Sequence, residues 1–153
     1  MSLRIKIEER YKNAIKSKNL DEANTLRLIK SAIKNKDIDS RTTKSKEGIN
    51  EQEILSLLQG LIKQRRDSID SFKIALRNDL IVIEQLEIDL INQFLPQQLN
   101  ETETKNIIKK IIKEQNFSSL KDMGVLMNSL KGEYTGSVDM TIAGKIAKSL
   151  LNN

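Results

Sequence analysis

The segment Ile54–Leu99, ILSLLQGLIKQRRDSIDSFKIALRNDLIVIEQLEIDLINQFLPQQL, decides the fold of this chain. It predicts two amphipathic helices that meet at Leu76–Leu80 and end at Pro96, the only proline. In each helix, apolar residues recur at spacings of three, four and seven, which places them on one face. The predicted faces are Ile54, Leu58, Leu61, Ile62, Ile69, Phe72 and Leu76 in the first helix and Leu80, Ile83, Leu86, Leu90, Ile91, Phe94 and Leu95 in the second. Because the connection is short, the two helices must be antiparallel neighbours.

The remaining chain also reads as helical. Apolar stripes predict two helices before this hairpin and three after it, and the content of Lys, Glu, Ile and Leu with few glycines favours helix over sheet. We therefore predict an all-α protein of two helical bundles, a four-helix N-terminal domain at residues 1–96 and a three-helix C-terminal domain at residues 97–153. Residues 37–48, DIDSRTTKSKEG, are predicted to form a polar loop. The predicted helix caps are Asp21, Asn50 with Glu53, Asn78 or Asp79, Asn100 or Thr102, and Asp139.

The chain contains neither His nor Cys. This removes the commonest general base, the thiol nucleophile and the usual transition-metal ligands. We therefore expect no catalytic residue, no metal site, no cofactor and no catalysis by this chain alone. No apolar run approaches the ~20 residues that span a bilayer, no secretory signal is visible and no disulfide can form. These features predict a cytoplasmic protein without a membrane partner.

Positive charge gathers toward the two ends of the sequence. Residues 1–50 hold 13 Lys and Arg against 7 acids, residues 51–96 hold 5 against 8, and residues 97–153 hold 8 against 6. Within the first segment, Arg27, Lys30 and Lys34 recur at spacings of three and four and form a basic strip on one predicted helix. Such asymmetry can mark a surface for a polyanion, and it is also what ordinary solvated Lys-rich helices show.

One arginine is expected to be structural. Arg65 falls beside the apolar face of the first hairpin helix, where a charge has to be paired or has to reach solvent. Glu84, Glu87 and Asp89 on the antiparallel helix are candidate partners, and a salt bridge of Arg65 with Glu84 and Glu87 is expected. Arg66 and Arg77 point elsewhere and are candidates for phosphate contacts.

Gly124 stands near the start of a short predicted helix in the sequence DMG. Glycine there costs about 1 kcal/mol relative to Ala, so the missing side chain must serve another purpose. Two explanations remain open, a close helix crossing and the close backbone approach of a ligand such as a sugar-phosphate.

Several segments together resemble the GatB/YqeY family, and most closely its stand-alone YqeY-like members. They are LRLIKSAIKN at Leu26–Asn35, KQRRDSI at Lys63–Ile69, RNDL at Arg77–Leu80, FLPQQL at Phe94–Leu99 and DMGVLM at Asp122–Met127. The resemblance covers essentially the whole chain in one order. The last segment departs from the family signature at Val125, where Lys is usual, and at Asn128, where Gly is usual.

The resemblance implies a fold of four helices followed by three, and a role connected with tRNA. The same module forms the tail of the B subunit of the glutamine-dependent aminoacyl-tRNA amidotransferase, where it holds tRNA, and it is appended to glutaminyl-tRNA synthetase in some organisms. The family label, carbon–nitrogen ligase with glutamine as amido donor, belongs to that complex. This chain lacks the catalytic body of the B subunit.

Charge and resemblance together predict a non-catalytic accessory module that binds tRNA through its phosphates. The expected contact residues are Lys121, Gly124, Lys131 and Lys145 in the C-terminal domain, with Arg27, Lys30, Arg66 and Arg77 as a secondary surface. The alternative is a helical adaptor that binds an amidotransferase subunit or an aminoacyl-tRNA synthetase without touching RNA. A third possibility, an independent amide-transferring enzyme, predicts glutaminase or ATP turnover, and the missing His and Cys argue against it.

Overall fold

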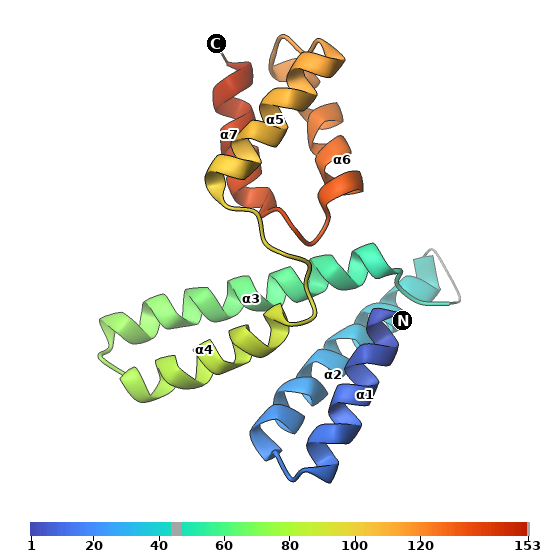
Figure 1. Ribbon diagram of the computed structural model, residues 1–153, viewed down its shortest axis with the longest axis vertical. Coiled ribbons are helices and arrows are strands. Elements are labelled where there is room, and N and C mark those ends of the chain that lie inside the picture. The colour runs from blue at the N-terminus through green and yellow to red at the C-terminus, as the bar shows by residue number, and fades with distance from the viewer. Residues whose placement is uncertain (44–46, 153) are drawn as a thin grey trace. The chain divides into compact units, whose positions relative to one another are not determined.

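The computed structural model describes residues 1–43 and 47–152, and within them the protein is all-α (Figure 1), as predicted. The chain divides into two compact units, residues 1–95 and residues 96–153. The helices are α1 (Leu3–Lys16), α2 (Leu20–Thr43), α3 (Glu51–Ile74), α4 (Asn78–Asn92), α5 (Glu101–Gln115), the short 3-10 helix η1 (Leu120–Asp122), α6 (Met123–Tyr134) and α7 (Met140–Leu151).

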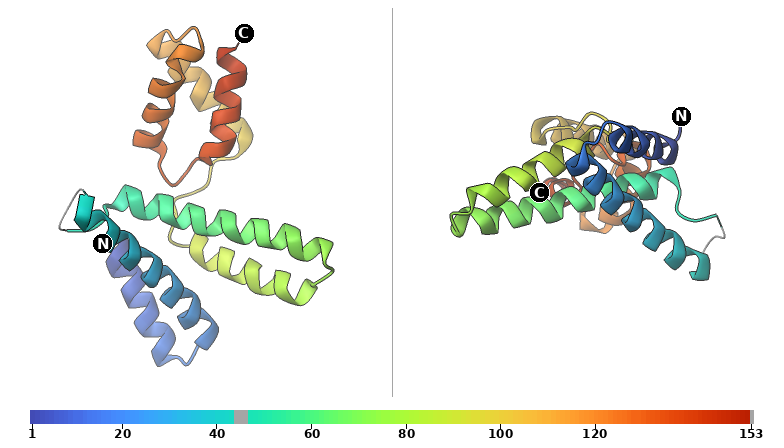
Figure 2. Two further views of the ribbon diagram at one scale, coloured as in Figure 1. Left: turned by 180° about the vertical axis from the view of Figure 1, so that it is seen from behind. Right: turned by 90° about the horizontal axis from the view of Figure 1, so that it is seen from below.

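The N-terminal unit consists of two antiparallel helix hairpins, α1–α2 and α3–α4 (Figures 1 and 2). Helix α2 joins the hairpins because it contacts both α3 and α4. All four helices contribute to one apolar core, whose fully buried side chains include Ile7, Leu26, Ile29, Ile54, Leu58 and Ile91. Isoleucine and leucine fill this core, as the low aromatic content requires.

Several helices begin where short polar side chains predict. Asn50 forms a capping box with Glu53 at the start of α3, Asn100 caps α5, and Asp139 accepts bonds from two amides at the start of α7. These contacts satisfy amide groups that have no partner inside the helix. The prediction for α4 was wrong, since its N-cap residue is Arg77 and no side chain caps it. The prediction of Asp21 was also wrong, because α2 already begins at Leu20 and the Glu22 amide donates to the side-chain oxygen of Asn19.

Helix α2 is longer than predicted. Residues 37–43 belong to α2 rather than to a loop, and residues 44–46 of the predicted loop lie outside the described part of the chain. The polar composition concealed the helix because this last stretch of α2 has no apolar stripe that a sequence pattern could show.

The face predicted for α4 is confirmed only in part, since Leu90 and Ile91 are buried and Phe94 and Leu95 pack against the core, but Ile83 and Leu86 do not. Ile88, Leu90 and Ile91 are buried, whereas Ile83 and Leu86 are 52% and 61% exposed. The sequence of α4 is apolar on two sides, so spacing alone could not tell the covered side from the open one. The prediction that Leu76 faces the core is also wrong, because Leu76 lies in the turn with 84% of its surface exposed.

The C-terminal unit has its own core. Helix α7 contacts both α5 and α6, and its inward alanines, Ala143 and Ala147, are fully buried. The amide of Leu99 donates to the carbonyl of Ser137 over 2.9 Å, which ties the segment before α5 to the loop before α7. The other fully buried side chains are Ile108, Leu126, Leu130 and Val138.

Candidate functional site

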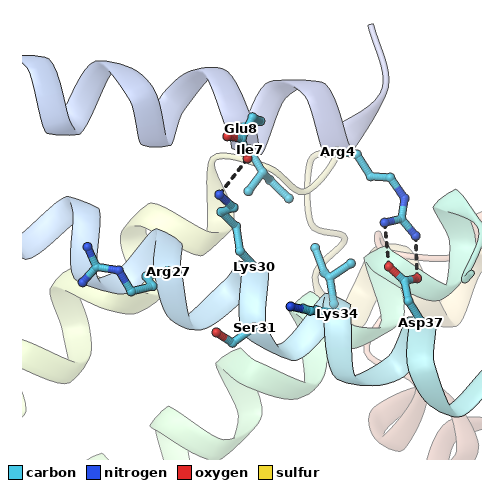
Figure 3. Close-up of a pocket in the computed structure, with 9 residues that line it drawn as sticks. Arg4, Ile7, Glu8, Arg27, Lys30, Ser31, Lys34 and Asp37 are labelled. Carbon is cyan, nitrogen blue, oxygen red and sulfur yellow. Dashed lines mark hydrogen bonds and ion pairs between the residues drawn. The ribbon is translucent and has the colours of Figure 1, made fainter.

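A basic cavity of about 410 Å³ opens between α1 and α2 (Figure 3). Its charged lining consists of four cations and two carboxylates, which gives a net charge of +2. The lining residues are Arg4, Ile7, Glu8, Arg27, Lys30, Ser31, Ile33, Lys34 and Asp37. The basic strip of α2 predicted from the sequence therefore forms one wall of a concave surface.

Lys30 is held at the centre of this cavity by two groups of α1. Its ammonium lies 2.8 Å from a carboxylate oxygen of Glu8 and 4.2 Å from the centre of the Tyr11 ring. The ion pair, above all its hydrogen bond, lowers the pKa of Glu8. A cation that contacts both an aromatic face and a carboxylate has fewer accessible positions, so the two contacts restrict the side chain of Lys30.

Two cations of the cavity have no carboxylate partner among the described residues. The Arg27 guanidinium donates to the side-chain oxygen of Asn24 at 3.0 Å and to the Tyr11 hydroxyl at 3.2 Å, both neutral groups. Lys34 is exposed on the same face of α2. Both positive charges are therefore available to an anion that enters the cavity.

At one end of the cavity, Arg4, Asp37 and Ile49 form a hydrogen-bonded cluster that joins α1, α2 and the segment before α3. This cluster is called the lock below. Asp37 accepts two hydrogen bonds from Arg4, at 2.8 and 2.7 Å, and one from the amide of Ile49 at 2.8 Å. Arg4 also donates to the carbonyl of Ile49 at 2.9 Å. Gly48 adopts φ +91°, and a Cβ there would overlap the Asp37 carboxylate. Only glycine fits this position without strain.

The hydrogen bonds of the lock shift the pKa values of Asp37 and Arg4. Hydrogen bonds from Arg4, more than any other cause, lower the pKa of Asp37, and the Ile49 amide adds to the effect. The same contact raises the pKa of Arg4. Of the six charged groups that line the cavity, Arg4 and Asp37 therefore form an ion pair that joins α1 to α2.

The four residues predicted to form a secondary RNA-binding surface lie in different places in the structure. Arg27 and Lys30 lie together in the cavity, whereas Arg66 is exposed on α3. Arg77 lies at the turn between α3 and α4, where it pairs with Asp79 at 3.0 Å. These four residues do not form one site.

The predicted residues of the C-terminal unit are all on its surface. Gly124 and Lys131 are seven residues apart on the exposed side of α6 and thus share a face, and Lys121 precedes them in η1. A Cβ at Gly124 would meet no atom within 4 Å, so no helix of this unit crosses closely there. Lys145 lies on a different helix, α7.

The structure joins Arg65 to Glu87 at 2.6 Å, with 12% and 22% of the two side chains exposed. Arg65 also donates to the carbonyl of Leu61 at 3.0 Å. Glu84 lies one turn before Glu87. Burial, followed by the charge of Glu87, raises the pKa of Glu84, while Arg65 opposes the shift. The predicted bridge thus has Glu87, rather than Glu84, as its direct partner.

Sequence reasoning missed Arg4 and Tyr11, and it considered Asp37 as a possible partner of the basic strip, whereas Asp37 pairs with Arg4. Arg4 and Asp37 are 33 residues apart, and no local spacing connects them. The one available signal was the antiparallel pairing of α1 and α2, which brings the Tyr11 side of α1 opposite the basic strip of α2.

Two further kinds of site are absent from the described residues. No helix there is long and apolar enough to cross a membrane. In the same part of the chain, no group of three or more Asp or Glu side chains is arranged to hold a metal ion.

The fold and the site define an all-α protein of two helical units with a basic cavity in the first. The sequence matches the family described as Yqey-like protein over residues 4–151. The chain therefore belongs to the YqeY-like family.

Among its relatives are fungal proteins named altered inheritance of mitochondria protein 41, mitochondrial. That of Pyrenophora tritici-repentis is 31% identical over 137 residues, 86% of this chain and 73% of that protein. That of Vanderwaltozyma polyspora is 28% identical over 151 residues, 93% of this chain and 79% of that protein. In Saccharomyces cerevisiae (strain YJM789) the match is 36% over 86 residues, 56% and 44% of the two chains. These proteins are named as mitochondrial, so the relatives do not support the cytoplasmic location expected from the sequence.

Proposed function

We propose that this chain is a non-catalytic accessory module that binds tRNA through its phosphates, related to the tail of the glutamine-dependent aminoacyl-tRNA amidotransferase. The observation that carries the proposal is the basic cavity of α1 and α2, with its net charge of +2. Phosphate neutralisation by Lys and Arg dominates the affinity of proteins for nucleic acids.

The geometry of the cavity supports phosphate binding over a purely solvated surface. Lys30 is fixed by Tyr11 and Glu8, and Arg27 is fixed by Asn24 and Tyr11. Ordering a free lysine or arginine costs up to about 2 kcal/mol of side-chain entropy, and here part of that cost has been met before a ligand arrives. Arg27 also offers a planar fork of donors that suits phosphate oxygens.

The C-terminal unit contributes a second, independent surface to the proposal. Lys121 and Lys131 flank the open backbone at Gly124, where no side chain prevents close approach. This is the arrangement expected if a sugar-phosphate backbone contacts α6.

Fluorescence titration of the chain with bulk tRNA tests the proposal. We expect binding at ~50 mM salt and a logarithmic slope of affinity against salt of about −2 to −3 if three cations contact phosphates. The double variant Arg27→Ala with Lys34→Ala should weaken binding and reduce that slope by about 1.5. The matched control, Lys6→Ala with Lys16→Ala, removes two exposed lysines of α1 outside the cavity. Absence of binding at ~50 mM salt would refute the proposal.

A further inference from the structure

Glu8 is a carboxylate in a cavity whose net charge attracts anions. It lines the cavity from α1, opposite the middle of the basic strip of α2 (Figure 3). One of its oxygens lies 2.8 Å from the Lys30 ammonium, and its side chain is 42% exposed. Because Glu8 cancels the charge of Lys30, only Arg27 and Lys34 offer a positive charge to an anion. A site for phosphates alone would bind them more tightly without this carboxylate, since like charges repel.

The ion pair with Lys30 leaves one oxygen of Glu8 open. The contact is made by Oε2, and Lys30 is the one hydrogen-bond partner of Glu8 in the described part of the chain. This hydrogen bond, more than any other cause, lowers the pKa of Glu8, so the carboxylate is ionised at neutral pH. An ionised carboxylate only accepts hydrogen bonds. Its open oxygen, Oε1, can therefore accept from a ligand that brings a donor into the cavity.

The order of the groups along the cavity matches the order of groups along an RNA strand. Arg27 and Lys34 are about two turns apart on one side of α2, and the pair of Lys30 with Glu8 lies between them (Figure 3). In a nucleic acid strand, each sugar lies between two phosphates. The sugar and phosphates within a DNA strand carry no hydrogen-bond donor, whereas the ribose of RNA carries its 2′-hydroxyl. A carboxylate between two phosphate-binding cations therefore fits RNA better than DNA.

We propose that Glu8 is a specificity-determining residue, which accepts a hydrogen bond from a ribose 2′-hydroxyl and makes the cavity select RNA over DNA. This inference rests on the phosphate-binding function proposed above, and it adds the sugar that the site recognises. Acidic side chains bind the ribose 2′-hydroxyl of dinucleotides in the same way. With DNA the carboxylate has no donor to bind, and it still repels the neighbouring phosphates. Lys30 is a positioning residue, since it holds Glu8 from the opposite wall of the cavity.

Fluorescence anisotropy of the full chain with three labelled single strands of one sequence tests the proposal. The strands are RNA, DNA and 2′-O-methyl RNA, which keeps the ribose but has no 2′-hydroxyl donor. The titrations are made at ~50 mM salt, where phosphate contacts are strong. The natural chain should bind RNA about tenfold more tightly than either of the other strands, as expected for a partly exposed hydrogen bond to a charged group.

The variant Glu8→Ala separates recognition of the hydroxyl from the positioning of Lys30. It leaves four cations and one carboxylate in the cavity, a net charge of +3 instead of +2. Binding of DNA should therefore become about threefold tighter or more, while the ratio of the affinities for RNA and DNA should fall toward one. If Glu8 only held Lys30 in place, both affinities would change alike. The matched control, Glu9→Ala, removes an exposed acid of α1 outside the cavity lining and should keep the natural ratio.

Two results would overturn this inference while phosphate binding stands. They are equal binding of RNA and 2′-O-methyl RNA by the natural chain, and an unchanged ratio in Glu8→Ala. Absence of binding by all three strands and by bulk tRNA would refute the proposed function, and this inference with it. If Glu8→Ala fails to fold by circular dichroism, Glu8→Gln replaces it. That variant must lower the ratio at least about threefold, because a neutral amide oxygen is a weaker acceptor than a carboxylate.

Discussion

Replacement of Asp37 by Asn tests the lock at the end of the cavity. The asparagine oxygen can still accept from the Ile49 amide, but the other Asp37 oxygen becomes an NH₂ group that faces the Arg4 guanidinium. One hydrogen bond between charged groups is lost, which is worth about 1.5–3 kcal/mol in a buried setting. The Arg4 side chain is 39% exposed, and solvent screening reduces the expected loss to about 1–2 kcal/mol.

This loss should be visible in thermal unfolding followed by circular dichroism at pH 7. For a unit of this size, about 1–2 kcal/mol corresponds to a decrease in Tm of ~5–15 °C. Asp67→Asn on the exposed side of α3 makes the same chemical change without a lock to break. This control should remain within about 0.5 kcal/mol of the natural chain.

The pH dependence gives the sharper result. Because the folded-state pKa of Asp37 is lowered, its contribution to stability is fully present above its unfolded pKa of about 3.9 and is lost as the pH falls through the folded value. The stability difference between the natural chain and Asp37→Asn should therefore be constant near neutrality and shrink in acid. A difference that persists undiminished at low pH, or an effect at pH 7 no larger than that of Asp67→Asn, would show that the ionised lock does not stabilise the unit.

Three further changes test the packing around the two hairpins. Gly48→Ala should destabilise the N-terminal unit by about 2–4 kcal/mol in urea unfolding, because alanine is strained at φ +91° and its Cβ displaces Asp37; an effect below about 0.5 kcal/mol would contradict the close approach. A double-mutant cycle of Arg65→Met and Glu87→Gln should give a coupling of about 1–2 kcal/mol, less than for a fully buried pair because both side chains keep some exposure; zero coupling would make the contact incidental. Glu84→Gln should increase the free energy of unfolding at pH 7, because a raised folded-state pKa means that ionisation of Glu84 favours the unfolded state. This increase should vanish below about pH 4, where Glu84 is protonated in both states. An increase that does not depend on pH would point to another cause.

The helical class and most helix starts could be predicted because they depend on local chemistry. Asn50, Asn100 and Asp139 act on amides three or fewer residues away, within reach of their own side chains. The length of α2 could not be predicted in this way, since Asp37 is held by Arg4 and Ile49, and only the folded chain brings these groups together.

In the candidate site, too, the local features could be predicted and the tertiary contacts could not. The spacing of Arg27, Lys30 and Lys34 predicted a basic strip, but the facing side of α1, with Tyr11 and Glu8, follows from helix pairing alone. Similarly, the sequence of α4 predicts an apolar helix with two possible inner faces. Which of the two faces is covered depends on how α4 packs against α3 and α2, and the sequence pattern does not contain this information.

The separation of the two cores has a consequence for synthesis of the chain. Every residue of the N-terminal core precedes Pro96, and every residue of the second core follows it. Contacts within each unit join helices that are near one another in sequence, which favours rapid folding. As the chain leaves the ribosome, the first unit can therefore complete its core while the second is still being translated.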